Sequence, residues 1–205
     1  MAARWTTTTT PSIPGVLLER DYDYVAVEWA GIAVVGVYVS PNNGLDAYGE
    51  FLDGVGNCVR RRCRPRQVLV LGDFNARSTH WEDTRTNSRG RMLADWAAGL
   101  GLLLSNRGFT STCVAWRGFS VVDVTWATAC LHRRIRDWRV IEGIETLSDH
   151  LYVMMELTPE PASTGRARNI SRGPSRSRPP PTPRWRLKDR YKDLLQAAVS
   201  VSACS

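Results

Sequence analysis

The chain of 205 residues allows one domain, or one domain followed by a tail. Hydrophobic residues make up 43% of it, and the longest such stretch, Ala30 to Val39, is strand-like and too short to span a bilayer, so no membrane segment is expected. The formal net charge of +7 includes two arginine-rich clusters, residues 60–66 and 166–190. Such clusters suit a phosphate-bearing partner, although a solvated tail is the simpler interpretation of the second.

The cysteines and the N-terminus indicate an intracellular compartment. The chain has five cysteines, an odd number, and Met1 is not followed by the basic and apolar segments of a secretory signal. Free thiols in a reducing compartment, nuclear or cytoplasmic, are therefore expected. The spacing of Cys58 and Cys63 does not match a zinc-binding pair, so zinc is not expected.

The first half of the chain predicts a hairpin followed by a strand between two helices. Residues 1–14, which are rich in threonine, predict a disordered start, and residues 16–18 are a short apolar piece that could begin a strand. Alternating and β-branched residues then predict two antiparallel strands joined by the turn Ala30-Gly31. In chain order the predicted elements are strands 24–29 and 32–39, helix 45–60, strand 68–71, polar loop 77–89 and helix 90–100.

The second half predicts short strands and then a change of composition. The predicted strands are 102–104, then 113–116 and 121–127 joined by a turn at 117–118, then 138–142 and 151–157. Residues 159–184 are rich in proline, arginine and serine and predict a linker. Residues 185–205 regain a helical pattern and predict the start of a further segment, so the domain is expected to span residues 15–158.

The sequence Val68 to Ala76 is the most informative stretch. Its apolar run predicts a strand buried on both faces, and it is followed by Asp73 and Asn75. Residues two apart in extended backbone point to the same side, so a carboxylate and a carboxamide come together at the carboxyl end of a buried strand. The pattern alone fits a strand-ending turn as well as a site for metal and phosphate.

Further polar residues lie at other predicted strand ends. Tyr38 closes one strand, Asp123 lies between two valines, and Asp149 and His150 precede the last strand. Taken singly, Asp123 could face solvent and His150 could be a surface residue. Together with Asp73 and Asn75 they predict a site for phosphodiester hydrolysis, which needs a hard cation, a base and donors to the phosphate.

These motifs resemble a known family in their order and spacing. They are Leu71-Gly72-Asp73-Phe74-Asn75-Ala76, Trp81, Arg89-Gly90-Arg91, Ser120 to Thr125, and Ser148-Asp149-His150. The chain from Val16 to Leu157 resembles the endonuclease/exonuclease/phosphatase superfamily, and more narrowly the apurinic-type endonuclease domain of non-LTR (LINE-type) retrotransposons. The resemblance implies an α/β fold, a four-layer sandwich of two mostly antiparallel sheets flanked by helices. It also implies DNA cleavage with Mg²⁺, or alternatively Mn²⁺, and a covalently linked reverse transcriptase.

The resemblance also implies roles for the residues that match its motifs. Asp73 would orient or deprotonate the attacking water, and Asn75 would hold that water or the scissile phosphate. Tyr38 would contact the phosphate, and Asp123 would support the site.

Four further roles come from the same resemblance. Asp149 would orient His150 or help to hold the metal, and His150 would donate to a phosphate oxygen. Thr112 and Ser148 would contact the substrate.

The chain departs from the family at its N-terminus. The family begins with a strand that ends in Asn and continues to a Gln-Glu pair whose Glu is the principal Mg²⁺ ligand, and neither Glu19 nor Glu28 matches that position. We therefore expect a chain truncated at its N-terminus, with an incomplete fold and reduced or absent activity. The alternative is a non-catalytic, basic relic that binds nucleic acid; a phosphatase of the same superfamily fits the motifs less well.

Overall fold

The computed structural model describes residues 14–116 and 118–158, all of which lie in one compact unit. The predicted disordered start, apart from Pro14, as well as the linker and the segment after it, lie outside the described residues. None of the helices in the described ranges is long and apolar enough to cross a membrane. The cysteines within these ranges, Cys58, Cys63, Cys113 and Cys130, are free thiols, as predicted.

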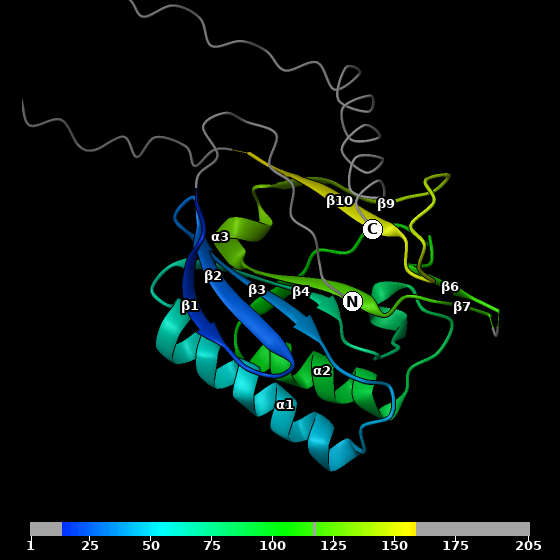
Figure 1. Ribbon diagram of the computed structural model, residues 1–205, viewed down its shortest axis with the longest axis horizontal. Coiled ribbons are helices and arrows are strands. Elements are labelled where there is room, and N and C mark those ends of the chain that lie inside the picture. Colours follow the sequence, from blue (N-terminus) through cyan, green and yellow to red (C-terminus); the bar gives the residue numbers. More distant parts are fainter. Residues whose placement is uncertain (1–13, 117, 159–205) are drawn as a thin grey trace, which may run out of the picture. The chain divides into compact units, whose positions relative to one another are not determined.

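Six strands form one mixed sheet (Figure 1) in the order β1-β2-β3-β4-β8-β5. They are β1 (Val16–Arg20), β2 (Tyr24–Trp29), β3 (Ile32–Tyr38), β4 (Gln67–Asp73), β8 (Asp123–Thr128) and β5 (Leu102–Leu104). The predicted hairpin is confirmed, since β2 and β3 pair antiparallel from Tyr24 opposite Val37 to Trp29 opposite Ile32. Only the β3–β4 pair is parallel, because the chain crosses between these strands through a helix.

Two long helices cover one face of this sheet (Figure 1). They are α1 (Leu45–Cys58), which continues into the π-helical turn η1 (Val59–Cys63), and α2 (Ser88–Gly99). Their apolar sides pack with Val68 and Val70 of β4 in the first core, which also contains Phe74 and Trp81. Helix α2 begins two residues before its predicted start, because the Asn87 side chain caps it by accepting the N–H of Gly90.

The opposite face of the sheet carries a second, smaller core. Leu69 of β4 packs there with Leu131 of the short helix α3 (Ala129–His132) and with the sheet of β9 (Ile135–Ile141) and β10 (Tyr152–Leu157). Helices, a large sheet and a small sheet are the layers expected of the predicted α/β sandwich. The fold class is confirmed, with three of its four layers in the described residues, where both long helices lie on the first core.

The predicted strand 121–127 is the main correction to the sequence analysis. Residues Cys113–Ala115 (β6) pair instead with Gly118–Ser120 (β7), and the next strand, β8, begins only at Asp123 and joins the six-stranded sheet. The connection is fixed by side chains, because the N–H of Val121 donates to Asp83 and the N–H of Val122 donates to the Thr112 hydroxyl. The predicted pair 113–116 and 121–127 thus combines one strand of this hairpin with a strand of the large sheet.

Glycine is required at position 72, next to the polar residues that end β4. Strand β4 extends through Gly72 to Asp73, and Gly72 adopts φ +142° opposite Val37. A Cβ atom here would lie 2.0 Å from the carbonyl oxygen of Val37. No side chain can occupy that space, so the close approach of β3 and β4 depends on this glycine.

Candidate active site

Three of the predicted site residues lie side by side on neighbouring strands. Tyr38 at the end of β3 pairs with Asp73 at the end of β4, and Asp73 pairs with Asp123 at the start of β8. Asp73 is buried, whereas Tyr38 is 41% exposed. The sheet therefore places a buried carboxylate between a second carboxylate and an accessible phenol.

Asn75 holds the carboxylate of Asp73 from the following loop. Its backbone N–H donates to Oδ1 of Asp73 at 2.9 Å, and its side-chain Nδ2 donates to Oδ2 at 3.0 Å. The same amide group also donates to the carbonyl of Val39 at 2.9 Å. Asn75 has φ +45°, a conformation that asparagine tolerates better than most residues. The motif is thus a strand-ending turn, and the turn itself orients the carboxylate of Asp73.

His150 completes the cluster from the loop before β10. Its Nδ1 lies 2.8 Å from Oδ2 of Asp123, and its Nε2 lies 3.7 Å from Oδ2 of Asp73. The hydrogen bond to Asp123 raises the pKa of His150 above its usual value, with further contributions from the charges of Asp123 and Asp73 and against the opposing effect of burial. The imidazolium form, which donates from both nitrogens, is therefore stabilised.

The pKa of Asp73 is raised from 3.8 to about 6. Burial is the main cause and the nearby charge of Asp123 is the second, while the hydrogen bonds from Asn75 and the charge of His150 act in the opposite direction. A carboxylate with a pKa this close to neutrality can accept a proton from water more effectively than an ordinary aspartate.

Asp149 was predicted to orient His150 or to help hold the metal, but the ring is hydrogen-bonded to Asp123, and Asp149 contributes its charge to the raised pKa of His150. Asp123 contacts the ring, and Asp149 is exposed and accepts the N–H of Val114 with its backbone carbonyl. The reason is geometric, since neighbouring residues of extended chain point to opposite sides. The exposed Ser148 accepts the backbone N–H of His150 with its hydroxyl at 3.2 Å, and its contact with a substrate stays a prediction.

Thr112 does not have the position predicted for it. Its side chain is fully buried, and its hydroxyl accepts the backbone N–H groups of Val122 and Asp123, each at 3.1 Å. These bonds hold the start of β8. Thr112 therefore orients Asp123 from behind and is not available to a ligand at the surface.

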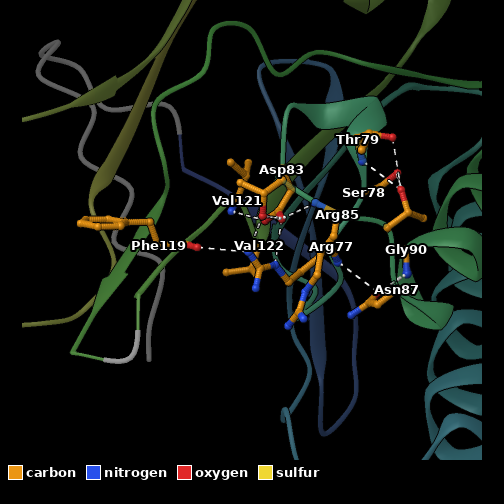
Figure 2. Close-up of polar contacts among 12 residues, drawn as sticks. Arg77, Ser78, Thr79, Asp83, Arg85, Asn87, Gly90, Phe119, Val121 and Val122 are labelled. Carbon is orange, nitrogen blue, oxygen red and sulfur yellow. Dashed lines mark hydrogen bonds and ion pairs between the residues drawn. The ribbon is translucent and has the colours of Figure 1, made fainter.

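Sequence reasoning missed a clamp in the loop that follows Asn75 (Figure 2). Arg77 and the buried Asp83 form an ion pair with Nε 2.8 Å from Oδ1. Arg77 also donates to the carbonyl of Phe119 at 3.1 Å, and Asp83 accepts the N–H of Val121 at 2.8 Å. The clamp ties the loop after β4 to the segment that leads into β8, and so connects the two strands that carry Asp73 and Asp123.

A hollow of about 480 Å³ lies beside the loop that carries His150. Its lining includes Phe109, Val114 and Phe119, of which both phenylalanines are largely exposed, and also Leu151, the residue after His150. Strand β6 is joined to this loop by the hydrogen bond from the N–H of Val114 to the carbonyl of Asp149. A hollow lined by aromatic and aliphatic side chains and also by Thr110, Ser111 and Glu142 thus lies next to the polar cluster.

Fold and site together define a protein of the endonuclease/exonuclease/phosphatase class. The family model described as endonuclease-reverse transcriptase matches residues 32–154, which include every residue of the cluster. The chain belongs to this family. A comparison with curated proteins gave no match.

Solved structures show the same fold. The endonuclease domain of TRAS1, a telomere-specific non-LTR retrotransposon, is 29% identical with a TM-score of 0.57, and the match covers 65% of this chain and 60% of that one. A 3'-5' exonuclease from Neisseria meningitidis is 20% identical with a TM-score of 0.53 over 66% of this chain and 64% of that one. An AP endonuclease from Archaeoglobus fulgidus is 17% identical with a TM-score of 0.55 over 66% and 65%. The chain thus spans less than two thirds of the length of each.

The described residues do not by themselves form a complete metal site. Within residues 14–116 and 118–158, no three His, Cys, Asp or Glu side chains are placed to hold a metal ion together. Asp73 accepts hydrogen bonds from Asn75 with both oxygens, and Asp123 is bonded to His150. This donor set is suited to positioning water and donating protons more than to binding Mg²⁺, which prefers several oxygen ligands in octahedral geometry.

Proposed function

We propose that this chain is the endonuclease part of a non-LTR retrotransposon polyprotein and that its chemistry is hydrolysis of phosphodiester bonds in DNA. The observation that carries the proposal is the cluster of Asp73, Asn75, Asp123 and His150 at the ends of adjacent strands. Membership of the family and the likeness to the TRAS1 domain support it. In such a polyprotein the chain is linked to a reverse transcriptase and acts inside the cell, in the nucleus or the cytoplasm.

Each residue of the cluster has a role that its contacts allow. Asp73, ionised and oriented by Asn75, accepts a proton from the attacking water. His150, protonated and held by Asp123, donates from Nε2 to a phosphate oxygen as negative charge develops there. The accessible hydroxyl of Tyr38 donates to the same phosphate.

Nucleases of this superfamily generally depend on a divalent metal ion. We propose Mg²⁺, with Mn²⁺ as an alternative, and a carboxylate of Asp149 as one ligand. Such an ion neutralises charge on the phosphate when bound. The described residues supply too few ligands for tight binding, so weak affinity and low activity are expected.

Relaxation of supercoiled plasmid tests the proposed function directly. The full chain with Mg²⁺ or Mn²⁺ is expected to convert supercoiled plasmid to the nicked form, and chelation with EDTA is expected to stop the reaction. Failure to nick with either ion, under conditions where the related TRAS1 domain serves as a positive control, would contradict the proposal for this chain.

The nicking rate is expected to depend on pH through Asp73. Because the pKa of this group is about 6, the reactive carboxylate is lost as the pH falls through that value, and the rate should fall about tenfold per pH unit below it. Initial rates at saturating metal ion measure this profile. Asp123→Asn should move the acidic limb to lower pH, because it removes a like charge beside Asp73. A limb near the ordinary aspartate value of 3.8 in the unmodified chain would exclude Asp73 as the base.

The second candidate function is binding of nucleic acid without cleavage. It is favoured by the incomplete metal site among the described residues and by the net charge of +7. Binding of labelled DNA would then weaken steeply as salt rises, since neutralised phosphates release counterions. Salt-dependent binding with no nicking under any metal condition favours this alternative.

A further inference from the structure

Arg89 is a buried arginine whose hydrogen bonds go to backbone carbonyls. It lies in the first turn of α2 and is 8% exposed. Its Nη1 donates to the carbonyl of Ser40 at 3.1 Å and to that of Asn75 at 3.5 Å. Its Nη2 donates to the carbonyl of Pro41 at 3.2 Å and to that of Asn43. A single guanidinium thus holds two segments that are far apart in the sequence.

The charge of Arg89 has no carboxylate partner among the described residues. Its guanidinium carbon lies 4.9 Å from the centroid of the buried Tyr48 ring, so carbonyl dipoles and an aromatic face compensate the charge. Burial of a cation without an anion is costly. An apolar residue would fill this space at less cost if packing were its only purpose.

The two segments are the loops that follow the strand ends of the site. Ser40 to Asn43 comes directly after Tyr38 and Val39, and Asn75 comes two residues after Asp73. Asn75 has a left-handed backbone, and its backbone N–H and side-chain amide both donate to Asp73. The bond from Arg89 to the Asn75 carbonyl acts on that same residue.

We propose that Arg89 is a positioning residue for the reaction, which fixes the loops after β3 and β4 so that Tyr38 faces the phosphate and Asn75 holds Asp73 in place. It does so from beneath the site and does not touch the substrate. The expected effect on the nicking rate rests on the proposed function, whereas the positioning of the two loops does not depend on it.

This role requires arginine and not just a positive charge, because it depends on the shape of the guanidinium group. A planar guanidinium reaches several carbonyls at once, whereas the ammonium of lysine is a single point on a flexible stem. Arg89→Lys should therefore retain the charge but hold the loops less well, and Arg89→Met should keep the aliphatic stem and lose every bond. Arg91 is exposed on the same helix, its side chain donates to the Ser88 hydroxyl, and it offers the matched control Arg91→Met.

Steady-state nicking and amide hydrogen exchange on the full chain test the proposal together. Arg89→Met should lower kcat about 100-fold with little change in KM, since misplacement of catalytic groups by about 1 Å has effects of this size. Arg89→Lys should fall between Arg89→Met and the unmodified chain. Exchange of the Asn75 amide should become faster in Arg89→Met than exchange in the β2–β3 hairpin, and Arg91→Met should change neither measurement.

The outcomes separate this inference from the proposed function. If the unmodified chain does not nick, the proposed function fails, and a selective rise of exchange at Asn75 in Arg89→Met still supports the positioning of the loops. Unchanged exchange at Asn75 overturns the inference whatever the activity. A uniform rise of exchange through the sheet also overturns it, because Arg89 would then stabilise the fold as a whole. Normal kcat in Arg89→Met would overturn its part in the reaction.

Discussion

Asp73→Asn is expected to lower the rate of plasmid nicking about 10²- to 10⁴-fold, the range typical of the loss of a general base. The substitution preserves shape and one acceptor oxygen, so the loop of Asn75 can keep part of its hydrogen bonding. It removes the group that accepts the proton of water, and neither the exposed Asp149 nor the His-bonded Asp123 lies in the same position. The measurement is the single-turnover rate at saturating metal ion.

The stability of the same variant distinguishes loss of chemistry from loss of fold. The folded-state pKa of Asp73 is raised above 3.8 to about 6, so between these pH values the folded chain binds the proton that the unfolded chain has released. The contribution of Asp73 to stability is therefore lost as pH rises through this window, and ionised Asp73 is destabilising above it. Asp73→Asn is expected to unfold at the same or a higher temperature than the parent above pH 6. Wild-type nicking in a stable variant would remove Asp73 from the mechanism.

Asp83→Ala is expected to reduce the free energy of unfolding by about 3 kcal/mol, the lower end of the range for breaking a buried ion pair. The side chain of Asp83 is fully buried and that of Arg77 is 22% exposed, so part of the lost interaction is regained from water by Arg77. The N–H of Val121 also loses its acceptor. Urea unfolding followed by tryptophan fluorescence measures the change, which is reported by Trp81 of the same loop.

Two further variants test the origin of this loss. Asp95→Ala removes an exposed carboxylate on α2 and should leave the free energy of unfolding nearly unchanged. Arg77→Met combined with Asp83→Ala should be less destabilised than the sum of the single changes, because no buried charge then stays without its partner. Strict additivity would mean that the two side chains act independently and that the clamp is not a unit.

The elements that were predicted correctly from the sequence are those whose burial follows from a local pattern of apolar residues. Strand β4 was predicted from four consecutive apolar residues, and the structure buries the first three of these four, Val68, Leu69 and Val70, between two cores. Asp73 and Asn75 were expected to come together from their spacing in extended backbone, whereas a left-handed turn at Asn75 makes the contact. The register that brings Tyr38 and Asp123 beside them depends on strand order, so the sequence indicated only that these residues lie at or in strands.

The residues that sequence missed act over long separations. Arg77 and Asp83 lie in a polar loop that hydropathy assigns to solvent, and their burial follows from contacts with Phe119 and Val121, about forty residues away. Arg89 was part of a recognised motif without a role, because its carbonyl acceptors belong mainly to a loop before α1. The Arg-Gly pair was the one available signal, since Gly90 leaves no room for a side chain against the Arg77 carbonyl.

Because β4 is buried on both faces, hydrophobic burial alone does not determine its register with β3. A slip of one residue would only exchange Val68 and Val70 with Leu69 and Leu71, all of them apolar, so neither core would reject it strongly. Gly72 favours the observed register, because at its φ of +142° a Cβ would lie 2.0 Å from the carbonyl oxygen of Val37. The glycine therefore helps to set the register that places Asp73 beside Tyr38.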